Sequence, residues 1–141
     1  MPAEPMTRTQ RATQVSFFLL RVIAGLLFFQ AGAVKLFGWY GGMPNGGTAS
    51  LATQIGIGGL IEVVGGIAIL LGLFTRPVAF ITSGQMAVAY WQFHAPHGRW
   101  PAQNHGLGAV LFCFIFLYFA AAGGGDLSLD ALLARRRNAK T

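Results

Sequence analysis

Long apolar stretches alternate along this chain with short polar or glycine-rich segments. A helix needs about 17–25 mainly apolar residues to cross a bilayer. Four stretches reach this length: about Val15–Phe37, Ile55–Phe74, Pro77–Phe93 and Gly106–Ala122. The pattern therefore predicts four membrane-spanning helices.

The segments between these stretches predict how the helices are connected. Only Thr75 and Arg76 separate the second stretch from Pro77, and proline is favoured at the start of a helix. We therefore expect the second and third helices to form a tight hairpin. Gly38–Gln54 is too rich in glycine and proline to form a regular element and predicts a loop.

A short helix is expected after the last apolar stretch, over Leu127–Leu133. Ser128 can cap its N-terminus, and Asp130 lies in its first turn. Arg135–Arg137 follow and suit both the end of a helix and an anionic lipid surface. We expect this helix to lie at the membrane interface.

Composition agrees with a membrane protein. Of the 141 residues, 54% are hydrophobic and 10% are charged, whereas about a quarter of the residues in soluble domains are charged. The single cysteine, Cys113, excludes an internal disulfide and a CxxC thiol relay.

The distribution of positive charge predicts the topology. Cytoplasmic loops of membrane proteins carry an excess of Lys and Arg. With four spans, most basic residues fall on the side of the termini: Arg8, Arg11, Arg76, Arg135, Arg136, Arg137 and Lys140. Both termini should therefore be cytoplasmic. This distribution also accounts for the net charge of +6, and no nucleic-acid motif accompanies it.

These features predict an all-α fold, an integral membrane four-helix bundle. Its domain organisation would be a disordered cytoplasmic N-terminus (residues 1–14), the transmembrane domain (15–133) and a basic cytoplasmic tail (134–141). One alternative for the first stretch is a secretory signal, because Arg8 and Arg11 precede an apolar run and Ala31-Gly32-Ala33 resembles a cleavage site. Arg21 interrupts that run, which argues against the alternative.

Glu62 lies within the second apolar stretch, where an ionisable group must be paired, protonated or in contact with water. Three residues of the first stretch are candidate partners: Arg21, Gln30 and Lys35. At about 1.5 Å per residue, Glu62 lies roughly 18 Å from the inner end of its helix, and the candidates lie at roughly 9, 22 and 30 Å. We favour Lys35, because it is on the side where the histidines gather.

Two interpretations of this charge pair remain open. Glu62 with Lys35 or Arg21 can be a structural ion pair that fixes the register of two helices. Alternatively, Glu62 handles protons beside a quinone head group, since quinone chemistry moves protons together with electrons. Phe28, Tyr90 and Phe112 would then supply aromatic walls.

All three histidines fall between the last two apolar stretches. His94 and His97 have the spacing of a metal-ligand pair, and His105 is a third candidate, but we expect loop histidines and no metal site. The candidate catalytic residues are Glu62, Lys35 and His105. The candidate residues for binding a cofactor, with quinone as the candidate, are Gln30, Tyr90, His94 and His97.

Several of these residues resemble the DoxX family of small bacterial and archaeal membrane proteins. The matching elements are Leu20-Arg21, Gly25, Gly32 and Lys35, then Glu62-Val63-Val64-Gly65-Gly66 and Leu70–Arg76, and finally Gly125–Asp130. The resemblance implies a four-helix membrane bundle. It also implies membership of a group named for a subunit of a thiosulfate:quinone oxidoreductase.

The sequence thus favours a membrane subunit or anchor of a quinone-linked redox complex, as a multi-pass protein of a bacterial or archaeal inner membrane. Its expected partners are the lipid bilayer, a soluble redox protein and further copies of the chain, and not nucleic acid. The alternative is a non-catalytic scaffold or small-solute permease. The chain carries no recognisable cofactor motif, so we do not expect it to be catalytic alone.

Overall fold

The protein folds into α-helices, which a computed structural model describes for residues 6–139. The α-helices are α1 (Arg8–Phe37), α2 (Gln54–Leu71), α3 (Thr75–Ala89), α4 (Leu107–Ala122) and α5 (Leu129–Asn138). Three short helical turns join them: η1 (Trp39–Gly41), η2 (Tyr90–His94) and η3 (Ala95–His97). No strand occurs in residues 6–139, so the all-α prediction is confirmed.

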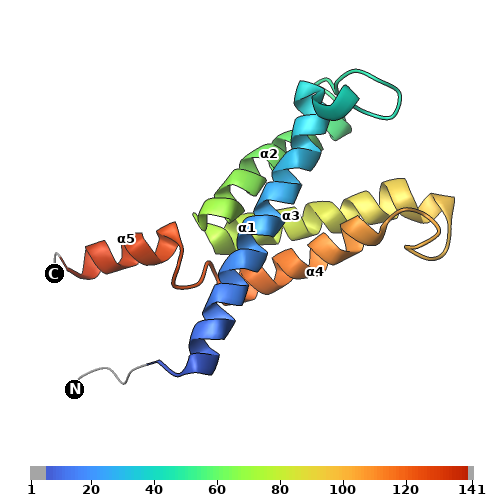
Figure 1. Cartoon of the computed structure of the whole chain (residues 1–141). Coiled ribbons are helices and arrows are strands. Elements are labelled where there is room, and N and C mark those ends of the chain that lie inside the picture. Colours follow the sequence, from blue (N-terminus) through green and yellow to red (C-terminus); the bar gives the residue numbers. More distant parts are fainter. Residues whose placement is uncertain (1–5, 140–141) are drawn as a thin grey trace.

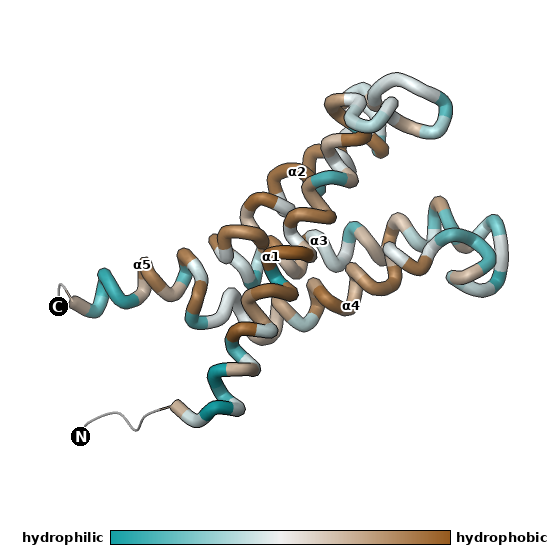
Figure 2. The backbone as a smooth tube through the Cα atoms, viewed as in Figure 1, coloured by the Kyte–Doolittle hydropathy of each residue, from teal (hydrophilic) through white to brown (hydrophobic). Residues whose placement is uncertain are grey.

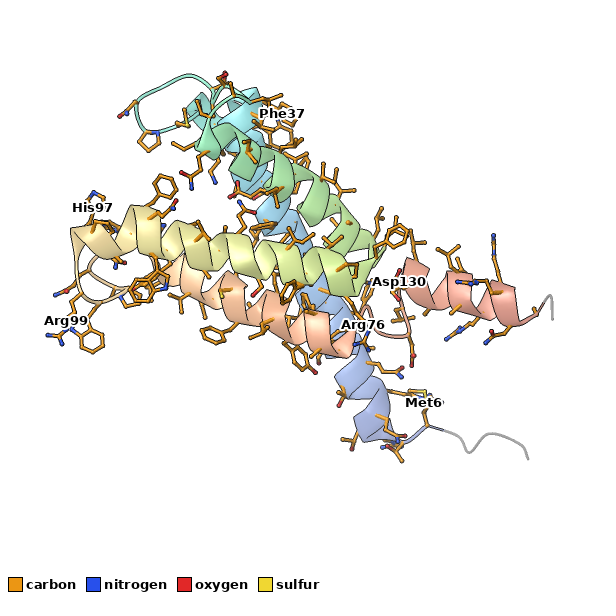
Figure 3. All side chains as sticks on the ribbon, turned by 180° about the vertical axis from the view of Figure 1, so that it is seen from behind. Met6, Phe37, Arg76, His97, Arg99 and Asp130 are labelled. Atoms are coloured by element: carbon orange, nitrogen blue, oxygen red, sulfur yellow. The ribbon has the colours of Figure 1, made fainter. Side chains whose placement is uncertain are left out.

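The four long helices form two antiparallel hairpins (Figure 1). Helices α1 and α2 make the first hairpin, and α3 and α4 make the second. The hairpins meet near the C-terminal end of α2 and diverge toward their loops, instead of running side by side along their whole length as in a closed four-helix bundle. Phe37 and His97 lie far apart at the two diverging ends (Figure 3).

The helix boundaries follow the apolar stretches closely, with one clear difference at the N-terminus. Helix α1 begins at Arg8 and not near Val15, so residues 8–14 of the segment expected to be disordered are helical. The reason is a capping box, in which the Thr7 hydroxyl accepts from the Gln10 N–H and the Gln10 side chain accepts from the Thr7 N–H. Residues 1–5, Lys140 and Thr141 lie outside the described residues.

Helices α2 and α3 are joined by the three-residue turn Gly72–Phe74, which confirms the predicted tight connection, although the two helices belong to different hairpins. Phe74 adopts a left-handed conformation with φ of 47°. Asp130 holds this turn, since its carboxylate accepts hydrogen bonds from the N–H groups of Phe74 (2.8 Å) and Thr75 (2.9 Å). Asp130 therefore caps the N-terminus of α3, whose N–H groups favour a negative charge.

Arg21 fixes the same region from α1. Its guanidinium donates to the carbonyl oxygens of Ile69 (2.8 Å) and Leu70 (2.7 Å) at the end of α2, and to Leu127 O (2.6 Å) before α5. A cation is favourable at a helix C-terminus, where the last carbonyls lack partners. We call Arg21, Gly72–Phe74 and Leu127–Asp130 the junction, because they tie α1, α2, α3 and α5 together.

The C-terminal helix was expected over Leu127–Leu133 and extends from Leu129 to Asn138. The Ser128 hydroxyl accepts from the Ala131 N–H, which confirms the predicted cap. Asp130 lies in the first turn and Arg135–Arg137 in the last turn, as expected. Figure 1 shows α5 projecting from the hairpins, so its leucines are exposed.

Two helices of the described chain, α1 and α2, are long and apolar enough to cross a membrane, and α4 is apolar but shorter. Figure 2 shows hydrophobic colour along α1, α2 and α4 and hydrophilic colour in the loops, at the start of α1 and at the end of α5. Most large apolar side chains point outward, among them Leu27, Ile57, Phe80 and Phe114. This arrangement suits lipid contact.

Candidate functional site

Glycines bring α1 and α2 into backbone contact. A Cβ atom on Gly25 would lie 2.5 Å from Leu70 N, and one on Gly66 would lie 2.5 Å from Phe29 N. On α1, Arg21, Gly25, Phe28 and Gly32 are spaced by three or four residues, share one face and are all buried. On α2, however, Gly59 and Gly66 face α1, while Gly58 and Gly65 face α3. Glu62 therefore lies between α1 and α3.

Glu62 is 1% exposed and forms an ion pair with Lys35. Lys35 Nζ donates to Glu62 Oε1. The Lys35 side chain remains 31% exposed, so the pair joins a buried carboxylate to a partly accessible cation. The structure thus pairs Glu62 with Lys35, the partner favoured among the three candidates.

Gln85 of α3 is the third member of the cluster. Its Nε2 donates to Glu62 Oε1 (3.2 Å) and to Gly58 O (3.0 Å). Glu62 Oε1 therefore has two donors, while Glu62 Oε2 and Gln85 Oε1 are buried and have no hydrogen-bond partner within residues 6–139. A buried acceptor without a partner is costly, and each such group in a native structure calls for an explanation.

A cavity of about 590 Å³ adjoins this cluster. We call it the Glu62 cavity. Most of its wall is apolar, and its polar lining residues are Lys35, Gln54, Glu62, Gln85 and His94. Binding sites for small molecules have this character, with a mainly apolar lining and a few placed polar groups. The remaining lining residues are Ala31, Val34, Met43, Pro44, Ile55, Gly58, Val88, Ala89 and Phe93.

A π-helical turn, η2, shapes the wall contributed by the second hairpin. Such turns are rare and often occur at functional sites. Phe93 and His94 of this turn line the cavity, and Gln92 Oε1 accepts from Gln54 Nε2 at the start of α2. The turn thus connects the two hairpins near their diverging ends.

His94 is the histidine that reaches the cavity. Its Nδ1 donates to Asn104 O (3.1 Å), which leaves Nε2 of the neutral ring as an acceptor. The ring of Tyr90 stacks on His94, with centroids 6.5 Å apart.

Several sequence-predicted residues lie elsewhere. His105 is exposed in the turn before α4, with φ of 58°, and does not line the cavity. His97 is exposed as well, and its Nδ1 donates to Phe93 O (2.9 Å). Gln30 is half-buried and does not line the cavity. Arg21 does not pair with Glu62, because its guanidinium binds backbone carbonyl groups at the junction.

The expected aromatic walls also differ from those observed. Phe28 and Phe112 pack on Phe116 in the core of the protein, and Phe93 is the aromatic residue of the cavity wall. Among residues 6–139, no three His, Cys, Asp or Glu side chains are grouped so as to hold a metal ion. The three histidines are therefore not brought together as ligands.

Sequence reasoning missed Gln85, although a signal was present. A three-residue turn joins α2 to α3, so residues equally far from this turn are brought toward one another. Glu62 lies nine residues before the end of α2 at Leu71, and Gln85 lies ten residues after the start of α3 at Thr75. The same count places Gln54 opposite Gln92.

Comparison with known proteins places the chain in a family. The DoxX family model matches residues 16–95. An uncharacterized protein of Haemophilus influenzae is 39% identical over 114 residues, which cover 79% of this chain and 85% of that protein. The inner membrane protein YqjF of Escherichia coli is 27% identical over 140 residues, covering 90% and 98% of the two chains. No solved structure matches significantly. Together with the apolar, outward-facing helices, these matches show that the chain is a membrane protein of the DoxX family.

Proposed function

We propose that this protein is a multi-pass inner membrane subunit of a redox complex and that it binds a quinone head group in the Glu62 cavity. The observation that carries the proposal is a buried carboxylate with one unpartnered oxygen, in the wall of an otherwise apolar cavity. The DoxX match and the inner membrane relative support the membrane location.

The cluster offers both kinds of hydrogen bond that a quinone requires. A quinone presents carbonyl acceptors, and the ammonium group of Lys35 has donors beyond the one used for Glu62. A reduced quinone presents hydroxyl donors, which Glu62 Oε2 and Gln85 Oε1 can accept. Glu62 can exchange the proton that accompanies the electrons, and the partly exposed Lys35 lies beside it in the cavity wall.

The chain alone supplies neither an electron donor nor a cofactor-binding motif. We therefore place it as a membrane subunit that holds the quinone while electrons pass between the quinone and a soluble redox protein. In the competing role, as a scaffold or small-solute permease, Glu62 and Lys35 would only hold α1 and α2 together.

Quinone retention tests the proposal. The protein is purified from native membranes in mild detergent and extracted with organic solvent, and quinone per mole of protein is measured. Wild type should retain quinone, and Glu62→Gln and Gln85→Leu should lose most of it. His105→Ala is the matched control and should retain the wild-type amount, because His105 lies outside the cavity. Equal quinone in wild type and Glu62→Gln would favour the scaffold.

The proposed topology has four spans with both termini in the cytoplasm, on the basis of the basic residues near the termini and Arg76. Reporter fusions in the two loops, at Gly46 and Gly98, should be external, and fusions after Arg76 and Lys140 should be internal. A cytoplasmic signal from the Gly98 fusion would contradict this topology.

A further inference from the structure

The seam between α2 and α3 carries a second, fully apolar depression, next to the Glu62 cavity. This groove has a volume of about 320 Å³ and is lined by Leu60, Ile61, Val64, Gly65, Val78 and Ile81. No polar side chain of the described chain lines it. We call it the α2–α3 groove.

The groove continues the cavity along the same seam. On α2, Gly58 and Glu62 line the cavity, and Ile61 and Gly65 line the groove at the following positions of the same helix face. On α3, Gln85 lines the cavity, and Ile81 lies one turn earlier in the groove. A molecule with its polar end at Glu62 and Gln85 can therefore extend along the seam into the groove.

The groove is shallow at one end and open at its rim. A Cβ atom on Gly65 would lie 2.7 Å from Thr82 Cγ2, so the glycine forms the floor where the two helices touch. Leu60 and Val64 of α2 and Ile81 of α3 form the rim of the groove, and all three side chains are exposed. Nearer the turn, Ile69 and Thr75 are buried.

We propose that the ligand of the Glu62 cavity is an amphiphile with a polar ring and an apolar chain, and that the first part of this chain lies in the α2–α3 groove. This inference rests on the proposed function. It identifies the ligand as a lipid-soluble quinone with a side chain, in contrast to a small water-soluble ring. The rest of the chain passes over the rim of Leu60 and Val64 into the bilayer.

The shape of the groove predicts how affinity depends on the chain. Only the carbons next to the ring contact the groove, so affinity should rise from a ring without a chain to a short chain and then level off. An added methylene in a fitted apolar pocket changes affinity or selectivity by about tenfold or more. We therefore expect decylubiquinone to bind at least about tenfold more tightly than the same quinone without a chain.

Binding is measured with the full chain in lipid nanodiscs, and empty nanodiscs correct for partition of each quinone into the lipid. The probes are the ubiquinone head group without a chain, its derivative with one isoprenoid unit, and decylubiquinone. Val64→Trp fills the groove from α2, and Ile81→Trp fills it from α3. Ile67→Trp is the matched control, because Ile67 is an exposed residue of α2 outside the groove.

Both groove variants should bind decylubiquinone as weakly as the quinone without a chain, while Ile67→Trp behaves as wild type. Glu62→Gln should weaken both ligands, because it alters the polar end of the site. Affinity that does not depend on the chain, or equal effects of Val64→Trp and Ile67→Trp, would overturn the groove assignment and leave the head-group site intact. If wild type binds neither quinone, the proposed function fails together with this inference.

Discussion

Arg21 and Glu62 are buried to the same degree, and the first hairpin contains both. Arg21 directs three hydrogen bonds at backbone carbonyls and holds α2 and the C-terminal segment in place. Within residues 6–139, Glu62 has two donors on one oxygen and none on the other, and it borders a cavity. Arg21 therefore stabilises the fold, whereas Glu62 keeps one oxygen available to a ligand.

The surroundings of the two residues explain this difference. Near Arg21 the hairpins converge, and Asp130, Arg76 and Arg21 all bind backbone groups at helix ends. Figure 3 shows Arg76 and Asp130 near this convergence, far from His97. At Glu62, side chains from α1, α2 and α3 line a cavity that they do not fill.

Replacing Arg21 should have the largest effect on stability. Arg21→Met removes the bonds to Ile69, Leu70 and Leu127. We expect a loss of roughly 3–5 kcal/mol in the free energy of unfolding, since a hydrogen bond to a charged group contributes about 1.5–3 kcal/mol and the contributions do not add fully. Denaturation by SDS in mixed micelles measures the loss. Arg11→Met, at an exposed position, should unfold like wild type. A loss below 1 kcal/mol would show that Arg21 is no more important than a surface charge.

A substitution in the contact between α1 and α2 should lower the free energy of unfolding nearly as much as Arg21→Met. Gly25→Ala places a methyl group 2.5 Å from Leu70 N, so the helices must separate. Overpacking of this kind costs about 1–3 kcal/mol. Gly84→Ala is the control, because in residues 6–139 no atom beyond its chain neighbours and the adjacent backbone of its own helix lies within 4 Å of the added Cβ. That variant should be unchanged or up to about 1 kcal/mol more stable, since alanine favours a helix. Thermal unfolding in detergent distinguishes them, and equal melting of the two variants would contradict the close approach.

Asp130→Ala should lower the free energy of unfolding by a smaller amount, about 1 kcal/mol, which is typical for the loss of an N-terminal helix cap. The N–H groups of Phe74 and Thr75 would lose their acceptor. Asp130→Asn keeps an oxygen acceptor and should restore most of the stability. The same detergent melt measures both variants. An alanine variant as stable as wild type would mean that solvent replaces the cap.

Glu62→Gln should change stability least and ligand binding most. The amide has the volume of the carboxylate and still accepts from Lys35, so we expect a loss below about 1 kcal/mol. Glu62→Ala should be less stable, because Lys35 and Gln85 then both lose an acceptor. Paired measurements of melting and quinone retention test the comparison with Arg21→Met. A large loss of stability in Glu62→Gln with unchanged quinone would make Glu62 a structural residue like Arg21.

Much of the fold followed from local patterns in the sequence. Apolar length predicted the four long helices, and the Gly72–Arg76 region predicted the tight turn between α2 and α3. Ser128 and Asp130 predicted the start of α5. The capping box at Thr7 was also a local signal, and reading it would have placed the start of α1 correctly.

The candidate site was predictable only in part. Glu62 stood out because a carboxylate is rare in an apolar helix, and Lys35 was favoured because it lies on the side of the histidines. Gln85 is uncharged, and burying it costs less free energy than burying a carboxylate, so it did not stand out in the sequence. The turn between α2 and α3 brings it beside Glu62. Both His94 and His105 were candidates, and only His94 lines the cavity, because sequence spacing does not show which way a loop turns.

The sequence by itself determined the residue types, the helices and the burial of one carboxylate, because these depend on hydropathy and on neighbours a few positions away. The tertiary structure decided which groups meet that carboxylate. Backbone contact at Gly25 and Gly66 sets the distance between α1 and α2, and the turn at Gly72–Phe74 sets the height of Gln85. The divergence of the hairpins leaves the cavity open, and it results from the packing of whole helices, which no single segment of the sequence encodes.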